Sequence, residues 1–526
     1  MGLYEILEST AKNSPKKTAV ICGNQRYNYK RFKERVDRLS SSLKALDIQK
    51  NDRIAIIHRN CHRYLETYYA AAKMGAVLVS LNFRLSAEDF LYILNDSLAK
   101  VLIAQPDLVL CLEGKKDSLP RLEHIILTES EPKGVWPVSF EFESLMQEAE
   151  SGEKKLFPVD ESDTAQIYYT SGTTGRPKGV VLTHKNNSAH AEGTIRELKL
   201  SAEDRWLHVS PMFHLADAWA VWAITRVAAT HVMVPGFEPE SVLEAIENHR
   251  ITLSNFIPTM LNILVNHPQV DSHDFSSLRL ILSGGAPIAK EVVRKVIEVF
   301  GCGYIQTYGL TETSPFLTMS ILKEEMNALS FEEKLKYMAS TGRPFDKVLL
   351  KIVKENGEDI LPNEKEVGEI IAMAETITPG YWRLPEETTR RIVNGWFHTR
   401  DLAVVNPEGY LTIVDRMDDV ILTGGENVYS IEVENILYSH PGVLEAAVIG
   451  LPDPIWGEKV TAVIVAKPGE KLDEDVIIQF CKENMAPFKA PKRVIFTDHL
   501  PKTGSAKIYK YKLREKYGKN KENYIE

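Results

Sequence analysis

The residues whose types most clearly suggest ligand binding lie in the stretch YYTSGTTGRPKGV, which runs from Tyr168 to Val180. Small hydroxyl residues and glycines follow strand-like sequence there and precede one lysine. Successive backbone N–H groups in such a turn, together with hydroxyls and an ammonium group, form a concave site suited to a polyphosphate. A Walker A loop needs Ser or Thr directly after its lysine, whereas Lys178 precedes Gly179, so a P-loop ATPase or kinase is not supported. The turn predicts phosphate binding of another kind.

Alternating strand-like and helix-like segments must position this turn. DRIAIIHR (52–59) predicts a buried strand, YLETYYAAAKMG (64–75) a helix ended by Gly75, and AVLVSL (76–81) the next strand. The order recurs later with a helix in SVLEAIENHR, strands in ITLSNFI and LRLILSGG, and a helix in IAKEVVRKVIEVF. This alternation favours an α/β architecture with largely parallel sheets.

The length and a change of pattern predict two domains. A chain of 526 residues exceeds what one hydrophobic core usually supports. Beyond DRMDD (415–419), a short helix, the strands EAAVIGL and KVTAVIVA, the helix DEDVIIQFCKEN and the strand RVIF form a compact α+β pattern of about 110 residues, a usual domain size. We therefore expect a large multi-sheet α/β domain over 1–416 and a small α+β domain over 417–526.

Composition and charge favour an ordinary enzyme. The chain is 44% hydrophobic and 26% charged, with a formal net charge of -9, so nothing predicts nucleic acid as a partner. The five cysteines show no CxxC and no metal-ligand spacing, which predicts reduced thiols in a cytoplasmic protein. No apolar run approaches bilayer length, and the N-terminus resembles no signal peptide. The expected assembly is a homodimer.

Together with the turn, a series of further strings resembles the adenylate-forming superfamily of acyl-CoA synthetases, peptide-synthetase adenylation domains and firefly luciferase. They occur in the family's order: PMFH (211–214), SGGAP (283–287), YGLTE (308–312), TGRP (341–344), GWFHTRD (395–401), DRMDD (415–419), GGENVYSIEVE (424–434) and LPKTGSAK (500–507). The resemblance covers most of the chain and implies an acetyl-CoA synthetase-like fold with a mobile C-terminal lid.

The reaction implied by this resemblance makes a carboxylate oxygen into a leaving group. The acid attacks the α-phosphorus of Mg-ATP, pyrophosphate departs, and the thiol of coenzyme A then displaces AMP from the acyl-adenylate. Such transfer depends mainly on positioning and on neutralising oxygen charge. ATP, Mg²⁺ and coenzyme A are the implied cofactors and co-substrates.

By resemblance, two groups of residues hold the nucleotide. The turn would bind the β- and γ-phosphates through Thr170, Ser171, Gly172, Thr173, Thr174, Gly175 and Lys178. Thr311 would contact the α-phosphate, and Glu312, with Thr174, would hold Mg²⁺, for which hard oxygen ligands are appropriate.

The rest of the nucleotide has its own implied contacts. Gly284, Gly285 and Ala286 would lie against adenine, with Tyr308 stacked on it, because missing side chains let a flat ring approach the backbone. Asp401 would accept hydrogen bonds from the ribose hydroxyls, assisted by Arg416.

The C-terminal domain is implied to take part in both half-reactions. Lys507 would bridge the acid and the α-phosphate, a contribution on the order of 3 kcal/mol for one preorganised donor. Asp418 matches the hinge position about which the lid rotates, and Gly424 and Gly425 would line the pantetheine tunnel. Domain alternation of this kind commonly gates turnover.

The acid pocket is indicated less directly. His214 matches the position that orients the carboxylate at the pocket mouth. Trp219 and Trp222 are three apart, as on one helix face, and bulky indoles there would favour medium-chain, alicyclic or aromatic acids over long chains. Packing of both indoles in the core is the alternative.

The chain departs from the family pattern at three positions. Arg400 stands where the family usually has the glycine of TGD; a positive φ there would store about 1 kcal/mol of strain, altering the ribose rim without loss of activity. Leu422 replaces a commonly basic residue, and Ala506 replaces a glycine before Lys507.

Three functions are compared. The leading hypothesis is an AMP-forming acid:CoA ligase of fatty-acid or aromatic-acid metabolism. The second is an acyl-adenylate enzyme that delivers to a carrier protein, disfavoured by the absence of a carrier domain after Lys507. The third is a non-catalytic nucleotide-binding regulator, disfavoured because Lys178, Glu312, Asp401 and Lys507 are all present.

Overall fold

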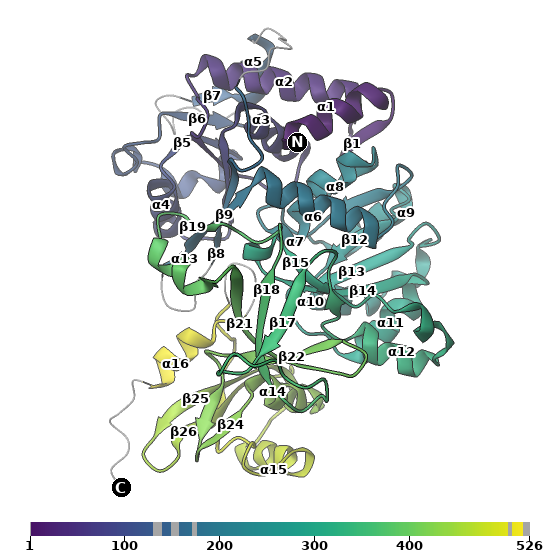
Figure 1. The fold of residues 1–526 in the computed structure, drawn as a ribbon, viewed down its shortest axis with the longest axis vertical. Helices are drawn as coiled ribbons and strands as arrows, with labels where there is room; N and C mark the ends of the chain where they lie inside the picture. The colour runs from purple at the N-terminus through teal and green to yellow at the C-terminus, as the bar shows by residue number, and fades with distance from the viewer. Residues whose placement is uncertain (1, 130–138, 149–156, 171–175, 503–507, 519–526) are drawn as a thin grey trace. The chain divides into compact units, whose positions relative to one another are not determined.

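A computed structural model describes residues 2–129, 139–148, 157–170, 176–502 and 508–518 (Figure 1). The chain divides into two compact units. The first comprises Met1–Thr170, Pro177–Leu350 and Ala372–Phe397, and the second is built mainly of Lys351–Ile371 and His398–Glu526.

One sheet of the first unit has eight strands. Its order is β19 (Gly380–Tyr381), β9 (Lys178–Thr183), β8 (Thr164–Thr170), β4 (Val77–Ser80), β3 (Arg53–Ile57), β5 (Ala99–Ala104), β6 (His124–Leu127) and β7 (Ser139–Glu141). Strands from β8 to β7 run parallel, while β9 is antiparallel to both β8 and β19. The turn predicted to bind phosphate therefore joins the antiparallel strands β8 and β9, and β8 is the last strand of the parallel part of the sheet.

The other sheet of this unit has nine strands. Its order is β16 (Arg343–Pro344), β15 (Phe316–Met319), β14 (Gly303–Gly309), β13 (Leu280–Gly284), β12 (Leu253–Phe256), β10 (Arg205–His208), β11 (Thr230–Met233), β1 (Thr18–Cys22) and β2 (Gln25–Asn28). The run from β14 to β1 is parallel. Both sheets confirm the predicted α/β class with largely parallel strands.

The first unit also contains helices, most of which bury one apolar face. They are α1 (Leu3–Asn13), α2 (Tyr29–Ala45), α3 (His62–Met74), α4 (Ala87–Asp96), α5 (Phe142–Glu148), α6 (His184–Glu197), α7 (Leu215–Ala218), α8 (Ala220–Arg226), α9 (Pro239–Asn248), α10 (Pro258–Val265), α11 (Lys290–Phe300), α12 (Phe331–Met338) and α13 (Pro385–Arg391). In α11, Val293, Val296 and Phe300 are buried, as their spacing predicts. Helix α3 ends where Gly75 adopts a φ of 63°, a helix stop that glycine permits.

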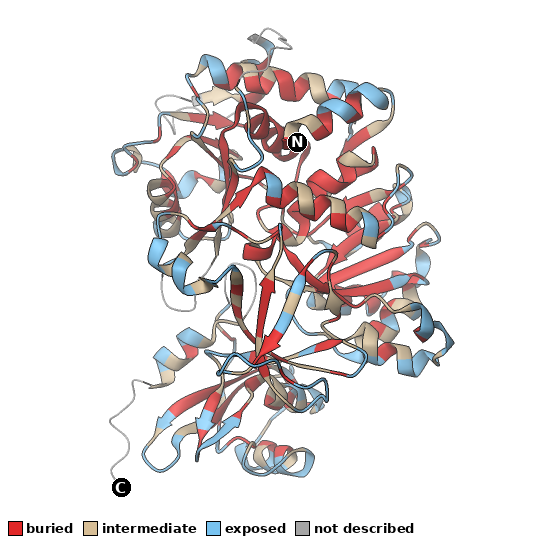
Figure 2. Ribbon diagram, in the orientation of Figure 1, coloured by how far each residue is buried: buried red, intermediate tan, exposed pale blue. Residues whose placement is uncertain are grey.

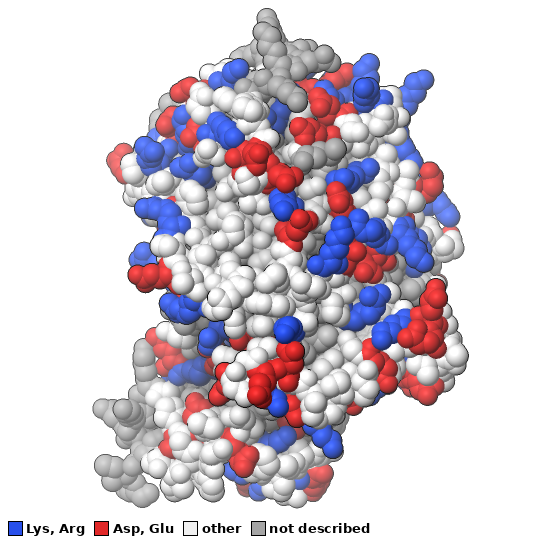
Figure 3. All heavy atoms as spheres, viewed as in Figure 1, with Lys and Arg blue, Asp and Glu red and all other residues white. Residues whose placement is uncertain are grey.

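Buried residues follow the strands of both sheets (Figure 2). The largest fully buried side chains include Trp206, Trp219 and Trp222. Charged side chains of both signs are interspersed over the first unit on the face that Figure 3 shows. No large field of one sign is therefore present on that face.

The second unit contains two sheets. The first sheet has the strand order β17 (Leu349–Val353), β18 (Gly368–Met373), β21 (Trp396–Val405) and β20 (Ile392–Val393), and β22 (Leu411–Arg416) also pairs with β21. Most residues of this sheet belong to the second unit. The other is β24 (Glu426–Val428), β23 (Ile421–Thr423), β26 (Gly457–Ala466) and β25 (Val443–Asp453), with β27 (Arg493–Phe496) paired to β26. Helices α14 (Ser430–Ser439), α15 (Glu474–Asn484) and α16 (Lys510–Gly518) complete the unit.

The α+β character expected for 417–526 is confirmed, since the strands and helices fall where the sequence indicated. The second compact unit also takes in 351–371 and 398–416, because β17, β18, β21 and β22 form one sheet. The boundary and hinge at 415–419 stay predictions. Within the described ranges, no helix is long and apolar enough to cross a membrane.

Candidate active site

The predicted phosphate turn connects two paired strands. Thr170 ends β8 and lies opposite Lys178, the first residue of β9. The Nζ of Lys178 is 2.8 Å from Oε1 of Glu387 in α13, and its side chain is one-quarter exposed. Thr170 and Lys178 are thus brought together as the turn requires, while Ser171, Gly172, Thr173, Thr174 and Gly175 lie outside the described residues.

The predicted adenine-binding residues lie where β13 ends. A Cβ on Gly284 would approach the Oγ1 of Thr307, on neighbouring β14, to 2.4 Å. Gly284 is therefore required by the pairing of two strands, whatever its part in binding. Gly285 has a φ of 85°, and a Cβ added to it would meet only Ile257 within 4 Å, at 3.9 Å. The space over Gly285 suits the approach of a flat group.

Tyr308, Thr311 and Glu312 follow on the next strand. Tyr308 lies near the end of β14, and Thr311 and Glu312 begin the 3₁₀ helix η5 (Thr311–Thr313). The Glu312 side chain is buried, and its Oε1 accepts a hydrogen bond of 2.8 Å from the hydroxyl of Tyr381. The predicted adenine-binding residues and the predicted α-phosphate and Mg²⁺ residues therefore follow the carboxyl ends of two neighbouring parallel strands, β13 and β14. Ligand sites in open α/β sheets usually lie at these ends.

His214 lies at the N-terminal cap of α7 and is half-buried. Its backbone carbonyl accepts hydrogen bonds from the N–H groups of Asp217 and Ala218. Asp217 is buried and accepts hydrogen bonds from Trp206 and from the ring of His208. The short helix after His214 is therefore fixed by a buried carboxylate.

The two indoles downstream are not on one uninterrupted helix, because α7 ends at Ala218 and α8 begins at Ala220. Trp219 packs against Trp206, Phe316 and His190, and Trp222 packs edge-on against Tyr68 and Tyr69. Both are 1% exposed. Core packing, the alternative interpretation, accounts for both indoles.

In the second unit, the two predicted ribose-binding residues form a pair. Asp401 on β21 lies opposite Arg416 on β22, and Nε of Arg416 is 3.2 Å from Oδ1 of Asp401. Asp401 is 5% exposed, whereas nearly half of the Arg416 side chain is exposed. The arginine partly neutralises the charge of this buried carboxylate.

Arg400, the residue that departs from the family pattern, has a φ of 61°. The expected positive φ is confirmed, and so is the steric demand that favours glycine there. Its guanidinium pairs with the carboxylate of Asp418, the predicted hinge residue. The ion pair offsets part of the backbone strain.

We predict that Arg400→Gly leaves the free energy of unfolding within about 1 kcal/mol of wild type. The substitution removes about 1 kcal/mol of strain and loses a half-exposed ion pair worth about 0–1 kcal/mol. Arg400→Ala keeps the strain and loses the pair, so it is expected to be the less stable variant. Urea denaturation of both variants measures this, and equal stability of the two would contradict the strain argument.

Gly424 and Gly425 form the two-residue turn between β23 and β24, with φ values of 60° and 85°. Positive φ at both central residues is typical of a type I′ hairpin. The glycines therefore have a local cause besides the predicted role in the pantetheine tunnel. Leu422, another departure, is 54% exposed on β23. Ala506 and Lys507 lie outside the described residues.

The sequence motifs did not predict two residues that contact the site, Tyr381 and Glu387. They contact Glu312 and Lys178 respectively, which are far away in the sequence. The string GYWRLPEET (380–388) indicates only a turn followed by a helix that begins with proline. No spacing in the sequence relates it to the residues it contacts.

A magnesium ion carried by ATP fits this donor set. In the part of the chain that the structure describes, no group of three or more His, Cys, Asp and Glu residues could hold a metal ion by itself. Mg²⁺ is commonly held by one or two carboxylates together with substrate phosphates and water. The buried carboxylate of Glu312 is a ligand of that kind.

Comparison with known proteins decides the family. A model of the AMP-binding enzyme family matches residues 7–382, and one of the AMP-binding enzyme C-terminal domain matches residues 432–507. The chain belongs to the AMP-binding enzyme family. It is an AMP-forming acid:CoA ligase that uses ATP, Mg²⁺ and coenzyme A.

Its relatives cover nearly the whole ligase chain. A feruloyl-CoA synthase from Amycolatopsis sp is 36% identical, with 97% of each chain covered. A long-chain-fatty-acid–CoA ligase from Thermus thermophilus is 34% identical and covers 98% of this chain and 96% of its own. The o-succinylbenzoate coenzyme A synthetase of Bacillus subtilis, in complex with ATP and magnesium ion, has a TM-score of 0.83 and 28% identity, covering 97% and 98%. The implied two-domain fold is thereby confirmed.

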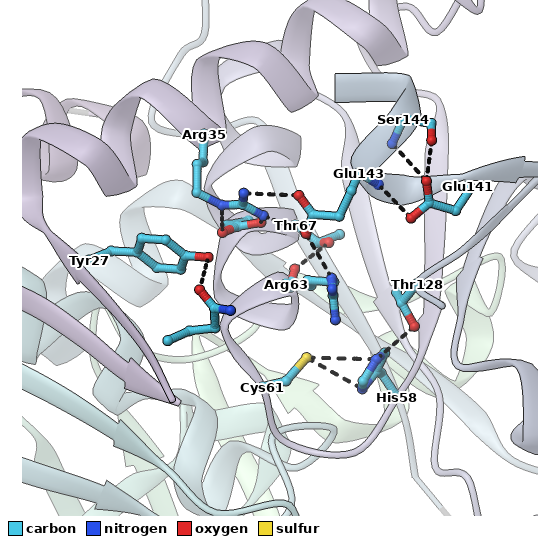
Figure 4. Close-up of polar contacts among 12 residues, drawn as sticks. Tyr27, Arg35, His58, Cys61, Arg63, Thr67, Thr128, Glu141, Glu143 and Ser144 are labelled. Atoms are coloured by element: carbon cyan, nitrogen blue, oxygen red, sulfur yellow. Dashed lines mark hydrogen bonds and ion pairs between the residues drawn. The ribbon is translucent and has the colours of Figure 1, made fainter. Parts of the chain in front are cut away.

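The ligase also contains a buried ionic cluster outside these motifs (Figure 4). Arg35 on α2 donates to both oxygens of Glu66, at 2.6 and 3.1 Å, and to both oxygens of Glu143, at 2.8 and 3.0 Å. Arg63 also donates to Glu143. These bonds join α2, α3 and α5.

Nearby, Cys61 and His58 are in contact, but burial raises the pKa of the Cys61 thiol to about 12, so this thiol is not nucleophilic at neutral pH.

Proposed function

We propose that the ligase forms acyl-adenylates in the site built around the β8–β9 turn and the end of β14. The turn residues Thr170–Gly175 and Lys178 hold the β- and γ-phosphates, Thr311 contacts the α-phosphate, and Glu312 with Thr174 holds Mg²⁺. The observation that carries this assignment is the buried carboxylate of Glu312, which stands at a sheet edge with a hydrogen-bond donor on one oxygen. A charge so placed is costly unless a cation is to be bound.

The same proposal assigns the rest of the nucleotide and the acid. Gly284, Gly285, Ala286 and Tyr308 contact adenine, and Asp401 with Arg416 binds the ribose. His214 orients the acid carboxylate, and Lys507 stabilises charge as pyrophosphate leaves. Asp418 serves as the hinge, and Gly424 and Gly425 approach the pantetheine chain in thioester formation.

We infer that the acid is of medium chain length, alicyclic or aromatic. The similarity to a feruloyl-CoA synthase supports this inference, while the similarity to a long-chain ligase speaks for longer acids.

An acid panel tests this inference. We expect kcat/KM for hexanoate-, cyclohexanecarboxylate- or cinnamate-type acids to exceed that for palmitate by at least about tenfold, the discrimination that a pocket of limited length provides. AMP release and acyl-CoA formation are measured for each acid. A preference for palmitate would contradict the inference about the acid while leaving the ligase chemistry intact.

The same assay separates coenzyme A from a carrier protein as acceptor. Acid-dependent ATP–pyrophosphate exchange reports adenylation alone, and addition of coenzyme A or of a phosphopantetheinylated carrier protein then scores thioester transfer. We expect coenzyme A to be the acceptor. Transfer only to the carrier protein would contradict that expectation.

We further propose a cytoplasmic location and, as the only protein partner, a second copy of the chain. All five cysteines are free thiols, and Cys111 is exposed, which suits a reducing compartment. Cell fractionation and light scattering after gel filtration measure the two properties.

A further inference from the structure

One segment of the first unit, residues 375–391, is hydrogen-bonded to β9, which carries Lys178, and to η5, which carries Glu312. We call it the clamp segment. Asn186 donates from Nδ2 to the carbonyls of Glu375 and Ile377, at 2.7 and 2.8 Å. The N–H of Thr378 donates to the carbonyl of Glu312 at 2.8 Å, and strand β19 pairs with β9. The clamp segment is therefore fixed both to η5 and to the strand that begins at Lys178.

The first side chain of interest in the clamp segment is Tyr381. Its hydroxyl is 2.8 Å from Oε1 of Glu312, and its side chain is buried. A carboxylate oxygen only accepts, so the phenol hydroxyl is the donor of this hydrogen bond. One oxygen of Glu312 is thereby held, and the orientation of the other is fixed.

The second is Glu387 in α13, whose Oε1 is 2.8 Å from Nζ of Lys178. Its Oε2 is 3.4 Å from Arg390. Burial alone would raise the pKa of the Glu387 carboxyl, but the hydrogen bond and charge of Lys178, with Arg390 and Arg391, hold it below its ordinary value. Glu387 is therefore ionised at neutral pH and restrains a lysine that otherwise has four rotatable bonds.

We propose that Tyr381 and Glu387 are positioning residues of the adenylation reaction: Tyr381 orients the carboxylate of Glu312 and Glu387 orients the ammonium group of Lys178. The inference rests on the roles proposed above for Glu312 and Lys178. Neither positioning residue needs to contact substrate, because each acts through the charged group that it contacts.

The chemistry explains why such restraint is useful. Charge develops on the departing pyrophosphate, and a donor that is already aimed stabilises it without reorganisation. An ammonium group has three donors, so Lys178 can bind a phosphate oxygen and Glu387 at once. A Mg²⁺ ligand likewise depends on the hydrogen bond to its other oxygen, and loss of such a partner typically costs about 10–100-fold in metal affinity or activity.

Tyr381→Phe in the full-length ligase tests whether Tyr381 orients Glu312, because the substitution removes one hydroxyl and keeps the ring. We expect the Mg²⁺ concentration for half-maximal ATP–pyrophosphate exchange to rise about tenfold, with a smaller change in thermal stability. In a Glu312→Gln background, the same substitution should add little, because its effect passes through Glu312. An unchanged Mg²⁺ response in Tyr381→Phe, or full additivity with Glu312→Gln, would overturn the assignment.

Glu387→Ala and Glu387→Gln test the second half. We expect Glu387→Ala to lower kcat for exchange about tenfold with a change in the KM for ATP of less than about threefold, since restraint matters most as charge develops. Glu387→Gln keeps an acceptor for the lysine and should recover part of the loss. A lower KM for ATP with unchanged kcat would overturn the assignment, because it would mean that Glu387 competes with phosphate.

Matched control variants separate positioning from general destabilisation. Tyr4→Phe removes a similar tyrosine–carboxylate bond, to Asp37 at 2.6 Å, and Glu192→Gln removes a similar ion pair, to Arg226 at 2.7 Å. Both controls should leave the Mg²⁺ response and kcat at wild-type values. Equal losses in control and test variants would overturn the inference alone, whereas a wild-type chain that makes no AMP from any acid would overturn the proposed function itself.

Discussion

Lys507→Ala is expected to lower acid-dependent ATP–pyrophosphate exchange by about 10²–10³-fold, which is the effect of removing one preorganised donor worth on the order of 3 kcal/mol. The proposed reason is that the Lys507 ammonium group bridges the acid and the α-phosphate while pyrophosphate leaves. Thioester formation from a chemically prepared acyl-adenylate should change by less than about threefold, because no pyrophosphate leaves in that step. Rapid-quench measurement of the two half-reactions checks both values.

Lys502→Ala is the matched control for Lys507→Ala. Lys502 lies five positions earlier in the same basic stretch, and its ammonium group pairs with Glu445. This pair is partly exposed, so its loss should alter stability by about 1 kcal/mol or less and leave exchange unchanged. If both lysine variants lose exchange equally, general positive charge in the tail, rather than Lys507 itself, is responsible.

Local sequence patterns predicted the fold well where each element buries its own apolar face. The strand in DRIAIIHR, the helix stopped by Gly75 and the α+β pattern after residue 419 are all present, because burial and backbone conformation act over a few neighbouring residues. The motifs also predicted that Asp401 and Arg416 would act together, and β21 and β22 place them opposite one another.

Contacts between distant parts of the chain were not predictable in this way. Nothing in the sequence near Lys178 indicates that Glu387 will be its partner, because the contact depends on β19 pairing with β9. The same holds for Tyr381 and Glu312. Two interpretations of Trp219 and Trp222 were open, since spacing alone does not distinguish a pocket wall from a core; the burial of both indoles shows their packing.

The largest stability effect should come from the buried ionic cluster in Figure 4. We predict that Arg35→Met lowers the free energy of unfolding by about 3–5 kcal/mol, because it leaves the carboxylate of Glu66 buried without its counter-ion. Glu66 is fully buried and makes a two-point contact with Arg35. Urea denaturation, followed by a signal from the first unit, measures the loss.

A control variant and a double variant test whether the buried charge causes this loss of stability. Arg31→Met, on the same helix, breaks a half-exposed pair with Glu34 and should cost less than about 1 kcal/mol. A double variant, Arg35→Met with Glu66→Leu, should recover much of the loss, because no buried charge remains. If Arg35→Met costs no more than Arg31→Met, the cluster does not stabilise the unit.

The sign of the pH effect follows from Glu66. Burial raises its pKa from 4.5 to about 7 even beside Arg35, and loss of Arg35 removes the main group that lowers this pKa. A carboxyl whose folded pKa lies above its unfolded value contributes stability below the unfolded pKa and loses it as pH rises through the folded pKa. Arg35→Met should therefore be more destabilising at pH 8 than at pH 5, where Glu66 takes up a proton and the buried charge disappears.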